Sequence, residues 1–218
     1  MSNYDRTKNK FILGDCMHPE YGLPSYPDKF FDLAIVDPPY GIGASKGYGQ
    51  SNNKKIHFQG KTWDNKIPDK QYFNELFRVS KNQIIWGGNY FYLAPSQGFV
   101  IWDKMQQAKN LSDCEMAWTS FQRPAKIARK RYLENYECNI YNTVKRIHPT
   151  QKPVDLYRWL LKNYAQPGDL ILDTHVGSAS SLIACESMDF NYHAFEIDPD
   201  YYAAAKKRMS AGIQKVMF

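Results

Sequence analysis

The sequence predicts an α/β fold in which a mostly parallel sheet carries helices on both faces. Two observations favour this fold class. Short apolar segments of strand length alternate along the chain with segments of helical periodicity. One of them, Phe31–Val36, is apolar almost throughout, as expected of a strand that is buried on both faces of a parallel sheet.

Seven strands and four helices are expected in chain order. The strands are expected at Lys10–Gly14, Phe31–Val36, Gln83–Trp86, Phe99–Trp102, Glu115–Phe121, Asp169–Asp173 and Asn191–Glu196. The helices are expected at Pro68–Val79, Val154–Tyr164, Ser180–Met188 and Asp200–Met209.

Local signals set the ends of these helices. Pro68 falls in the first turn of the first helix, where no N–H donor is needed, and apolar residues follow it at helical spacing. Pro153 precedes the second helix, and the Gln-Pro-Gly turn at 166–168 ends it. Asp198 and Pro199 cap and start the last helix.

Length and composition indicate one folded domain. With 218 residues, of which 43% are hydrophobic, the chain can bury one substantial core, so we expect a single domain over residues 1–218. The four cysteines form no CxxC pair and show no zinc-ligand spacing, so we expect no metal site and reduced thiols in a cytoplasmic protein. No apolar run approaches the roughly 18–20 residues that span a bilayer.

The formal charge of +6 is unevenly distributed along the chain. Residues 41–63 contain four lysines and no acid, and residues 123–146 contain seven lysines or arginines against two glutamates. Basic segments that also carry aromatic residues favour contact with nucleic-acid phosphates over a merely solvated surface. The candidate DNA contacts in these segments are Lys54, Lys55, Lys61, Arg123, Lys126, Arg129, Lys130 and Arg131.

The segment LDTHVGSAS, Leu172–Ser180, has the order of a nucleotide-binding loop: a strand, small residues and a helix N-terminus. Gly177 lets a ligand approach the backbone, and Glu196 ends the next strand, where an acid can accept hydrogen bonds from ribose hydroxyls. Taken alone, these residues fit a plain βαβ unit equally well. NAD is disfavoured because the GxGxxG triplet is absent.

The motif DPPY, Asp37–Tyr40, follows the strand 31–36 and is by itself either a proline turn or an active site. It is followed by HPTQKP at His148–Pro153, by LDTHVGSAS and by FEID at Phe195–Asp198. In this order the motifs resemble the beta group of S-adenosylmethionine-dependent DNA amino-methyltransferases, which modify adenine N6 or cytosine N4. The resemblance implies a three-layer Rossmann-like methyltransferase fold, circularly permuted, with a seven-stranded sheet that contains one antiparallel strand.

The resemblance also implies roles for the DPPY residues. Asp37 and the Pro38 carbonyl are expected to accept hydrogen bonds from the target amino group, whose lone pair is otherwise delocalised into the base. Pro39 stiffens the turn, and Tyr40 is expected to stack on a base that has left the duplex. Asp37 is also expected to border the cofactor.

For the cofactor S-adenosyl-L-methionine, the resemblance implies contacts from several strand ends. The methionine part is expected near Asp173, Gly177 and Ser178, the ribose at Glu196, the adenine near Asp15, and the methionine carboxylate near Lys152.

The cofactor loop departs from the family pattern D-P-F-x-G-S-G. It reads Asp173-Thr174-His175-Val176-Gly177-Ser178-Ala179, so His175 stands where the family has phenylalanine and Ala179 where it has glycine. We expect His175 to fill the place of that ring as a packed or cofactor-contacting residue, with a proton-transfer role as the alternative.

The resemblance bears on target and partners as well. Asp37 favours adenine over cytosine, because serine is the commoner first residue in cytosine-N4 enzymes. A small target-recognition insertion is expected at 122–147 and a mobile DNA-facing loop at 41–66. The partners to consider are double-stranded DNA, a second copy of the chain and a separate restriction endonuclease.

Three alternatives stay open at this point. The target is cytosine N4, or the substrate is RNA or a protein amide, or the chain is a non-catalytic DNA-binding relative with a degenerate cofactor loop. A bacterial or phage origin fits each of them.

Overall fold

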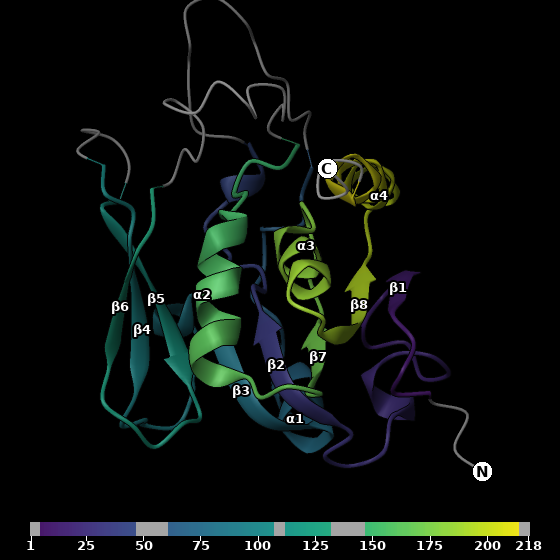
Figure 1. Cartoon of the computed structure of the whole chain (residues 1–218), viewed down its shortest axis with the longest axis horizontal. Coiled ribbons are helices and arrows are strands. Elements are labelled where there is room, and N and C mark those ends of the chain that lie inside the picture. The colour runs from purple at the N-terminus through teal and green to yellow at the C-terminus, as the bar shows by residue number, and fades with distance from the viewer. Residues whose placement is uncertain (1–4, 47–60, 107–111, 132–146, 214–218) are drawn as a thin grey trace, which may run out of the picture.

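A computed structural model describes residues 5–46, 61–106, 112–131 and 147–213. In these ranges eight strands form one sheet, flanked by four α-helices (Figure 1). The strands are β1 (Lys10–Leu13), β2 (Phe31–Val36), β3 (Ser80–Trp86), β4 (Phe99–Asp103), β5 (Cys114–Thr119), β6 (Lys126–Arg129), β7 (Leu170–Asp173) and β8 (Asn191–Glu196). The helices are α1 (Lys70–Val79), α2 (Val154–Tyr164), α3 (Ser180–Ser187) and α4 (Pro199–Ile213).

The sheet has the strand order β1-β8-β7-β2-β3-β5-β4-β6. Only β5 runs antiparallel to its neighbours β3 and β4 within this described sheet, which confirms the expected mostly parallel sheet with one antiparallel strand. The expected number of strands was wrong, because the described sheet has eight strands and not seven.

The eighth strand, β6, lies in the segment 122–147, which was expected to be an insertion for target recognition. It pairs in parallel with β4 at the edge of the sheet. Only Ala128 of its four residues is buried, so the sequence carries almost no apolar pattern there. Backbone pairing with β4, and not burial of side chains, defines this strand.

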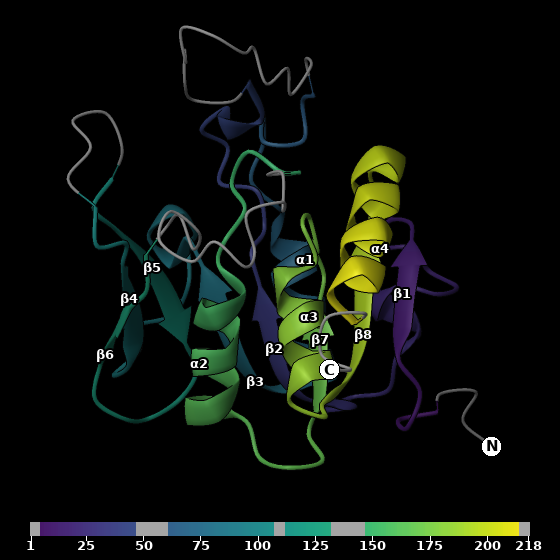
Figure 2. The ribbon, with the colours of Figure 1, turned by 45° about the horizontal axis from the view of Figure 1, so that its top comes forward.

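The helices cover both faces of the sheet and give the three expected layers (Figures 1 and 2). From Leu33 to Val36 the side chains of β2 alternate between two cores, as a strand buried on both faces requires. Leu33 and Ile35 pack in the core that contains α2 and α3, whereas Ala34 and Val36 pack in the core that contains α1. The nearly continuous apolar run at 31–36 is thereby explained.

The helix boundaries follow the local signals closely. Helix α2 has the expected bounds, and α1 begins two residues after Pro68 because Asp69 caps it by accepting the Tyr72 N–H at 2.9 Å. Since β1, β8, β7 and β2 are consecutive and parallel, their carboxyl ends meet at one edge of the sheet. In open α/β sheets this edge is where ligands bind.

Candidate active site

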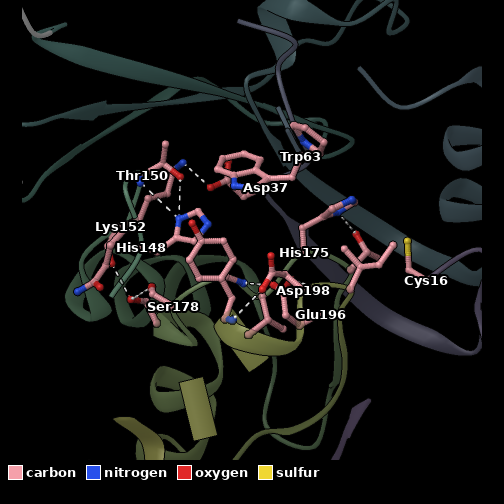
Figure 3. A pocket seen from close by; sticks show the side chains of 18 of the residues that line it. Cys16, Asp37, Trp63, His148, Thr150, Lys152, His175, Ser178, Glu196 and Asp198 are labelled. Atoms are coloured by element: carbon pink, nitrogen blue, oxygen red, sulfur yellow. Dashed lines mark hydrogen bonds and ion pairs between the residues drawn. The ribbon is translucent and has the colours of Figure 1, made fainter. Parts of the chain in front are cut away.

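A cavity of about 300 Å³ lies at this edge, where the chain leaves β1, β2, β7 and β8 (Figure 3). Most of the residues that the sequence singled out meet there, although they come from four separate strand ends and from the HPTQKP segment. The expected site residues that line the cavity are Asp15, Asp37, Pro39, Lys152, His175, Gly177, Ser178 and Glu196. Pro38, Tyr40 and Asp173 are not among its lining residues.

The Asp37 side chain is held from two sides. Its Oδ1 accepts a hydrogen bond from the Tyr40 hydroxyl at 2.5 Å, and its Oδ2 accepts one from Lys152 Nζ at 2.6 Å. The Lys152 side chain is only 3% exposed. A carboxylate with both oxygens engaged has a fixed direction, which is what a group that must orient a substrate amine requires.

Lys152 also pairs with Glu115 of β5, at 3.0 Å, and Glu115 pairs in turn with Lys104 at 2.8 Å. The site thus contains a chain of alternating charges, Asp37–Lys152–Glu115–Lys104, with two acids and two bases. Sequence reasoning assigned no role to Glu115. It lies in β5, and only the antiparallel pairing of β5 with β3 brings it beside the end of β2.

The neighbours of each charge set its pKa. Burial raises the pKa of the Asp37 carboxyl, and the Lys152 ammonium offsets this only in part. Burial acts to lower the pKa of Lys152, but the Asp37 and Glu115 carboxylates outweigh it and raise that pKa. Burial acts to raise the pKa of Glu115, but Lys152 and Lys104 outweigh it and lower that pKa. Lys152 is therefore a permanent cation at neutral pH.

Tyr40 packs in an aromatic cluster. Its ring is stacked on Tyr90 with centroids 5.0 Å apart and planes 12° apart, and Phe91 contacts it edge-on at 6.1 Å. Gly87 allows this arrangement, because a Cβ atom there would lie 2.2 Å from the Tyr40 ring. Tyr90 is 43% exposed, so the stacked pair reaches from the site to the surface. Tyr90 was not singled out from the sequence, although it follows β3 in the segment QIIWGGNYF.

The cofactor loop is shaped by Glu196 at the end of β8. One carboxylate oxygen accepts the Gly177 N–H at 2.7 Å and the other accepts the Asp198 N–H at 2.9 Å. Gly177 has φ of +55°, a backbone conformation that glycine adopts without strain. A Cβ atom there would lie 3.5 Å from the His148 ring, so the absence of a side chain leaves more space in the cavity. Each carboxylate oxygen of Glu196 retains a second lone pair that can face the cavity.

Ala179 ends the loop in the left-handed conformation, with φ of +61°. The family pattern has glycine there, and this backbone conformation explains that preference. At this position the departure from the family pattern therefore concerns backbone strain in the loop.

Asp173 lies beneath the loop. It is 3% exposed and accepts hydrogen bonds from the Ser181 hydroxyl and, at 3.0 Å, from the His175 N–H. Burial raises its pKa to about 7. The geometry makes Asp173 a support that joins the loop to α3.

His175 lines the cavity, as its place in the loop predicts. Its Nδ1 lies 2.9 Å from Thr174 Oγ1, and its ring meets Tyr72 edge-on at 5.4 Å. Burial lowers the pKa of the imidazole to about 4, so the ring is neutral at pH 7. A neutral flat ring is what a replacement for phenylalanine requires.

Four further aromatic side chains line the cavity without having been expected there: those of Trp63, His148, Tyr157 and Tyr201. Trp63 and His148 pack with ring centroids 5.1 Å apart, and His148 meets Tyr201 edge-on at 4.4 Å. His148 opens the quoted HPTQKP motif, so its position was the one available signal.

Comparison with known proteins gives the family. The model of a family described as DNA methylase matches residues 101–207. The type II methyltransferase M.HpaI of Haemophilus parainfluenzae is 31% identical over 240 residues, which cover 90% of this chain and 73% of that relative. The chain belongs to this family of DNA methylases. The family comprises N6-adenine and N4-cytosine methyltransferases that depend on S-adenosylmethionine.

Solved structures of DNA methylases share the fold. The M1.HpyAVI–SAM complex has a TM-score of 0.57 at 19% identity and covers 91% of this chain and 98% of that one. PvuII DNA methyltransferase, described as cytosine-N4-specific, also has a TM-score of 0.57, at 13% identity, and covers 96% of this chain and 92% of that one. The fold is therefore equally close to both.

In this DNA methylase the residues expected to contact DNA are dispersed. Lys61 pairs with Asp198 and with Asp200, and Arg123 packs over the Tyr164 ring at 4.5 Å. Both cations thus have partners within the protein. On or after the edge strand β6, Lys126, Arg129 and Arg131 are exposed and Lys130 is half-buried. Lys54 and Lys55 lie outside the described residues.

The described residues contain no group of three or more His, Cys, Asp or Glu side chains that could hold a metal ion. They also contain no helix long and apolar enough to cross a membrane.

Proposed function

We propose that this DNA methylase transfers the methyl group of S-adenosylmethionine to the N6 amino group of an adenine that has left the DNA duplex. The observation that carries the proposal is the fixed Asp37 carboxylate at one end of the cavity, held by Lys152 and Tyr40. Its direction suits an acceptor of hydrogen bonds from an exocyclic amine.

The residues of the cavity fit S-adenosylmethionine. The volume of about 300 Å³ suits a small cofactor. Glu196 presents a buried carboxylate beside Gly177, where no side chain takes up cavity space. We assign Glu196 to the ribose hydroxyls, Asp15 to the adenine side, and Gly177 and Ser178 to the methionine part. When bound, the cofactor supplies a methyl group on a positively charged sulfur.

With the cofactor bound, the amino nitrogen of the base would take the methyl group that S-adenosylmethionine supplies, S-adenosylhomocysteine would remain, and one amino proton would pass to solvent. Asp37 and the Pro38 carbonyl accept hydrogen bonds from the two amino hydrogens. They thereby localise the lone pair and stabilise the positive charge that develops on nitrogen. Pro39 limits the backbone, and Tyr40 offers its ring for stacking, a contact worth roughly 1–3 kcal/mol per base.

Lys152 has a different role in this proposal from the one expected. Its ammonium lies between Asp37 and Glu115, so we assign it to the orientation and ionisation of Asp37 and not to the methionine carboxylate. Asp173 acts through the loop that it supports, and His175 acts as a neutral wall. We keep Lys126, Arg129, Lys130 and Arg131 as candidate contacts to DNA phosphates or bases.

The choice of adenine rests on Asp37, the residue that favours N6 enzymes in the resemblance. Cytosine N4 is the second candidate, because the cytosine-N4-specific PvuII enzyme has the same fold with the same TM-score as the M1.HpyAVI complex.

Nucleoside mass spectrometry tests the proposal. The protein is incubated with isotopically labelled S-adenosylmethionine and double-stranded DNA of mixed sequence, with RNA as a parallel sample. We expect labelled 6-methyladenine from the DNA. Labelled 4-methylcytosine alone would contradict the assigned base, and the absence of any methylated base would contradict the transfer itself.

A further inference from the structure

Asp64 is a buried carboxylate with no part in the chemistry described so far. It is 1% exposed and comes just after the segment 47–60, which lies outside the described residues. Its neighbour Trp63 lines the cavity and packs on His148 (Figure 3). A buried carboxylate is costly unless hydrogen bonds stabilise it, so its partners should show what it does.

All the hydrogen bonds that Asp64 accepts within the described residues come from the backbone just after Pro39. Its Oδ1 accepts the N–H groups of Tyr40 at 2.6 Å and of Gly41 at 2.9 Å. Its Oδ2 accepts the Ala44 N–H at 2.7 Å, and its carbonyl accepts the Gly43 N–H at 3.1 Å. One residue thus holds four of the five N–H groups between Tyr40 and Ala44.

The two prolines restrict only some of the backbone torsions of the DPPY turn, and these hydrogen bonds restrict it further. The proline rings fix φ at Pro38 and at Pro39, and Pro39 also restricts ψ of Pro38 because it follows it. The torsion ψ of Pro39 remains free. Since the Tyr40 N–H lies just beyond that torsion, its bond to Asp64 fixes how the Pro38 carbonyl is directed relative to Tyr40.

Gly41 lets the turn wrap around this carboxylate. Its φ of +72° lies in the left-handed region, so the chain reverses after the Tyr40 and Gly41 N–H groups that share Oδ1 and brings the Ala44 N–H to Oδ2. The Asp64 carboxylate therefore takes the place of a bound anion in the turn that follows Asp37 and Pro38, the two proposed hydrogen-bond acceptors.

We propose that Asp64 is a positioning residue for methyl transfer, which fixes the DPPY backbone so that the Pro38 carbonyl and the Asp37 carboxylate point at the same amino group. This inference rests on the proposed roles of Asp37 and Pro38. Because Trp63 adjoins Asp64 in the chain, the same short segment closes the cavity wall and aligns the acceptors.

The test compares Asp64→Asn and Asp64→Ala with a matched control, Asp69→Ala. Asp69 also accepts a backbone N–H, that of Tyr72, but it caps α1 and does not line the cavity. Melting temperature, S-adenosylmethionine binding by calorimetry, and kcat and KM for DNA methylation are measured for each. Asp64→Asn keeps one oxygen and serves as the milder variant.

We expect kcat to fall about 10²-fold in Asp64→Ala, because a misplacement of about 1 Å in a reacting group costs that much, and by less in Asp64→Asn. The dissociation constant for S-adenosylmethionine should change by less than about threefold, since Asp64 does not line the cavity. Asp69→Ala should keep the wild-type kcat even where its melting temperature falls. A folded Asp64→Ala protein with a kcat like that of Asp69→Ala would overturn the inference.

Amide hydrogen exchange separates this inference from the proposed function. In the wild type, the N–H groups of Tyr40, Gly41 and Ala44 should exchange slowly, and in Asp64→Asn they should exchange faster, at Ala44 most of all. Unprotected wild-type amides would refute the positioning role whatever the activity. An inactive wild type with protected amides would contradict the proposed function alone.

Discussion

Lys152 Nζ lies 2.6 Å from Asp37 Oδ2 and so joins the HPTQKP segment to the DPPY turn, 115 residues apart in the chain. The two motifs that identify the family in sequence are thus one unit in space. Lys152 opposes the effect of burial on the pKa of Asp37 and fixes the direction of its carboxylate, which gives the HPTQKP lysine a physical task.

Lys152→Met removes the cation that opposes the effect of burial on Asp37. Burial already raises the pKa of Asp37. Without Lys152 this pKa rises further, so the active, ionised form of Asp37 is lost at a higher pH as the pH falls. We expect kcat at pH 7 to fall about 10²-fold and the acidic limb of the pH–rate profile to move to higher pH. Steady-state kinetics from pH 5 to 9 measure both.

Lys152→Arg is the control, because it retains the positive charge. Its acidic limb should stay near that of the wild type even if kcat is reduced by imperfect geometry. An unchanged acidic limb in Lys152→Met would show that Lys152 does not set the ionisation of Asp37.

Glu115→Gln leaves Lys152 and Lys104 without the carboxylate that they share. Because this removes one partner of a buried ion pair, we expect the free energy of unfolding to fall by about 3 kcal/mol. Asp155→Asn is the matched control, since Asp155 pairs with Arg158 on the exposed face of α2 and an exposed pair contributes about 0.5 kcal/mol. Urea unfolding followed by circular dichroism compares them, and equal losses would contradict a buried network.

Tyr90→Ala removes the ring that is stacked on Tyr40. An aromatic pair contributes about 0.5–1.5 kcal/mol, so kcat/KM for DNA should fall roughly 2–10-fold as Tyr40 loses its orientation. Tyr90→Phe retains the ring and should restore the wild-type value. If Tyr90→Phe is as impaired as Tyr90→Ala, the hydroxyl and not the stacked ring is what matters.

His175→Phe places the family's usual ring in the cofactor loop. The imidazole pKa is about 4 in the folded chain and about 6.5 in the unfolded chain, so between these values the unfolded state binds more protons. The neutral His175 therefore makes a contribution to the free energy of unfolding that is fully present above pH 6.5. This contribution decreases as the pH falls toward 4, by at most about 1.4 kcal/mol per pH unit. His175→Phe has no imidazole to protonate, so its free energy of unfolding relative to that of the wild type should increase as the pH falls.

The same variant decides between the two readings of His175. A ring that only forms the cavity wall predicts that methyl transfer at pH 8 stays within a few-fold of wild type in His175→Phe. A loss of transfer with intact cofactor binding would instead favour the proton-transfer role.

The fold was largely predictable because apolar periodicity reports burial directly. The strand 31–36 and the helix 154–164 have the bounds that their patterns indicate. Strand β6 was missed because three of its four side chains are exposed and only its backbone pairs. Local sequence does not encode such an edge strand.

The candidate site was predictable where a motif carries it and not where a tertiary contact does. Asp37, Gly177 and Glu196 follow strands that end at one edge, so their convergence could be expected. Glu115 and Asp64 reach the site only through the antiparallel course of β5 and the return of the chain at residues 61–66. Glu115 begins the segment EMAWTSF, which resembles one of the family's middle strands, but this resemblance assigns the residue no role. Asp64 belongs to no motif that carries the resemblance.

Single-turnover methyl transfer by Asp37→Ala tests the central claim most directly. Labelled S-adenosylmethionine and DNA are mixed with each protein, and the methyl group on DNA is counted while calorimetry follows cofactor binding. Loss of transfer with a cofactor dissociation constant within a few-fold of wild type is the predicted result. Transfer at the wild-type rate in Asp37→Ala would contradict the role given to this carboxylate.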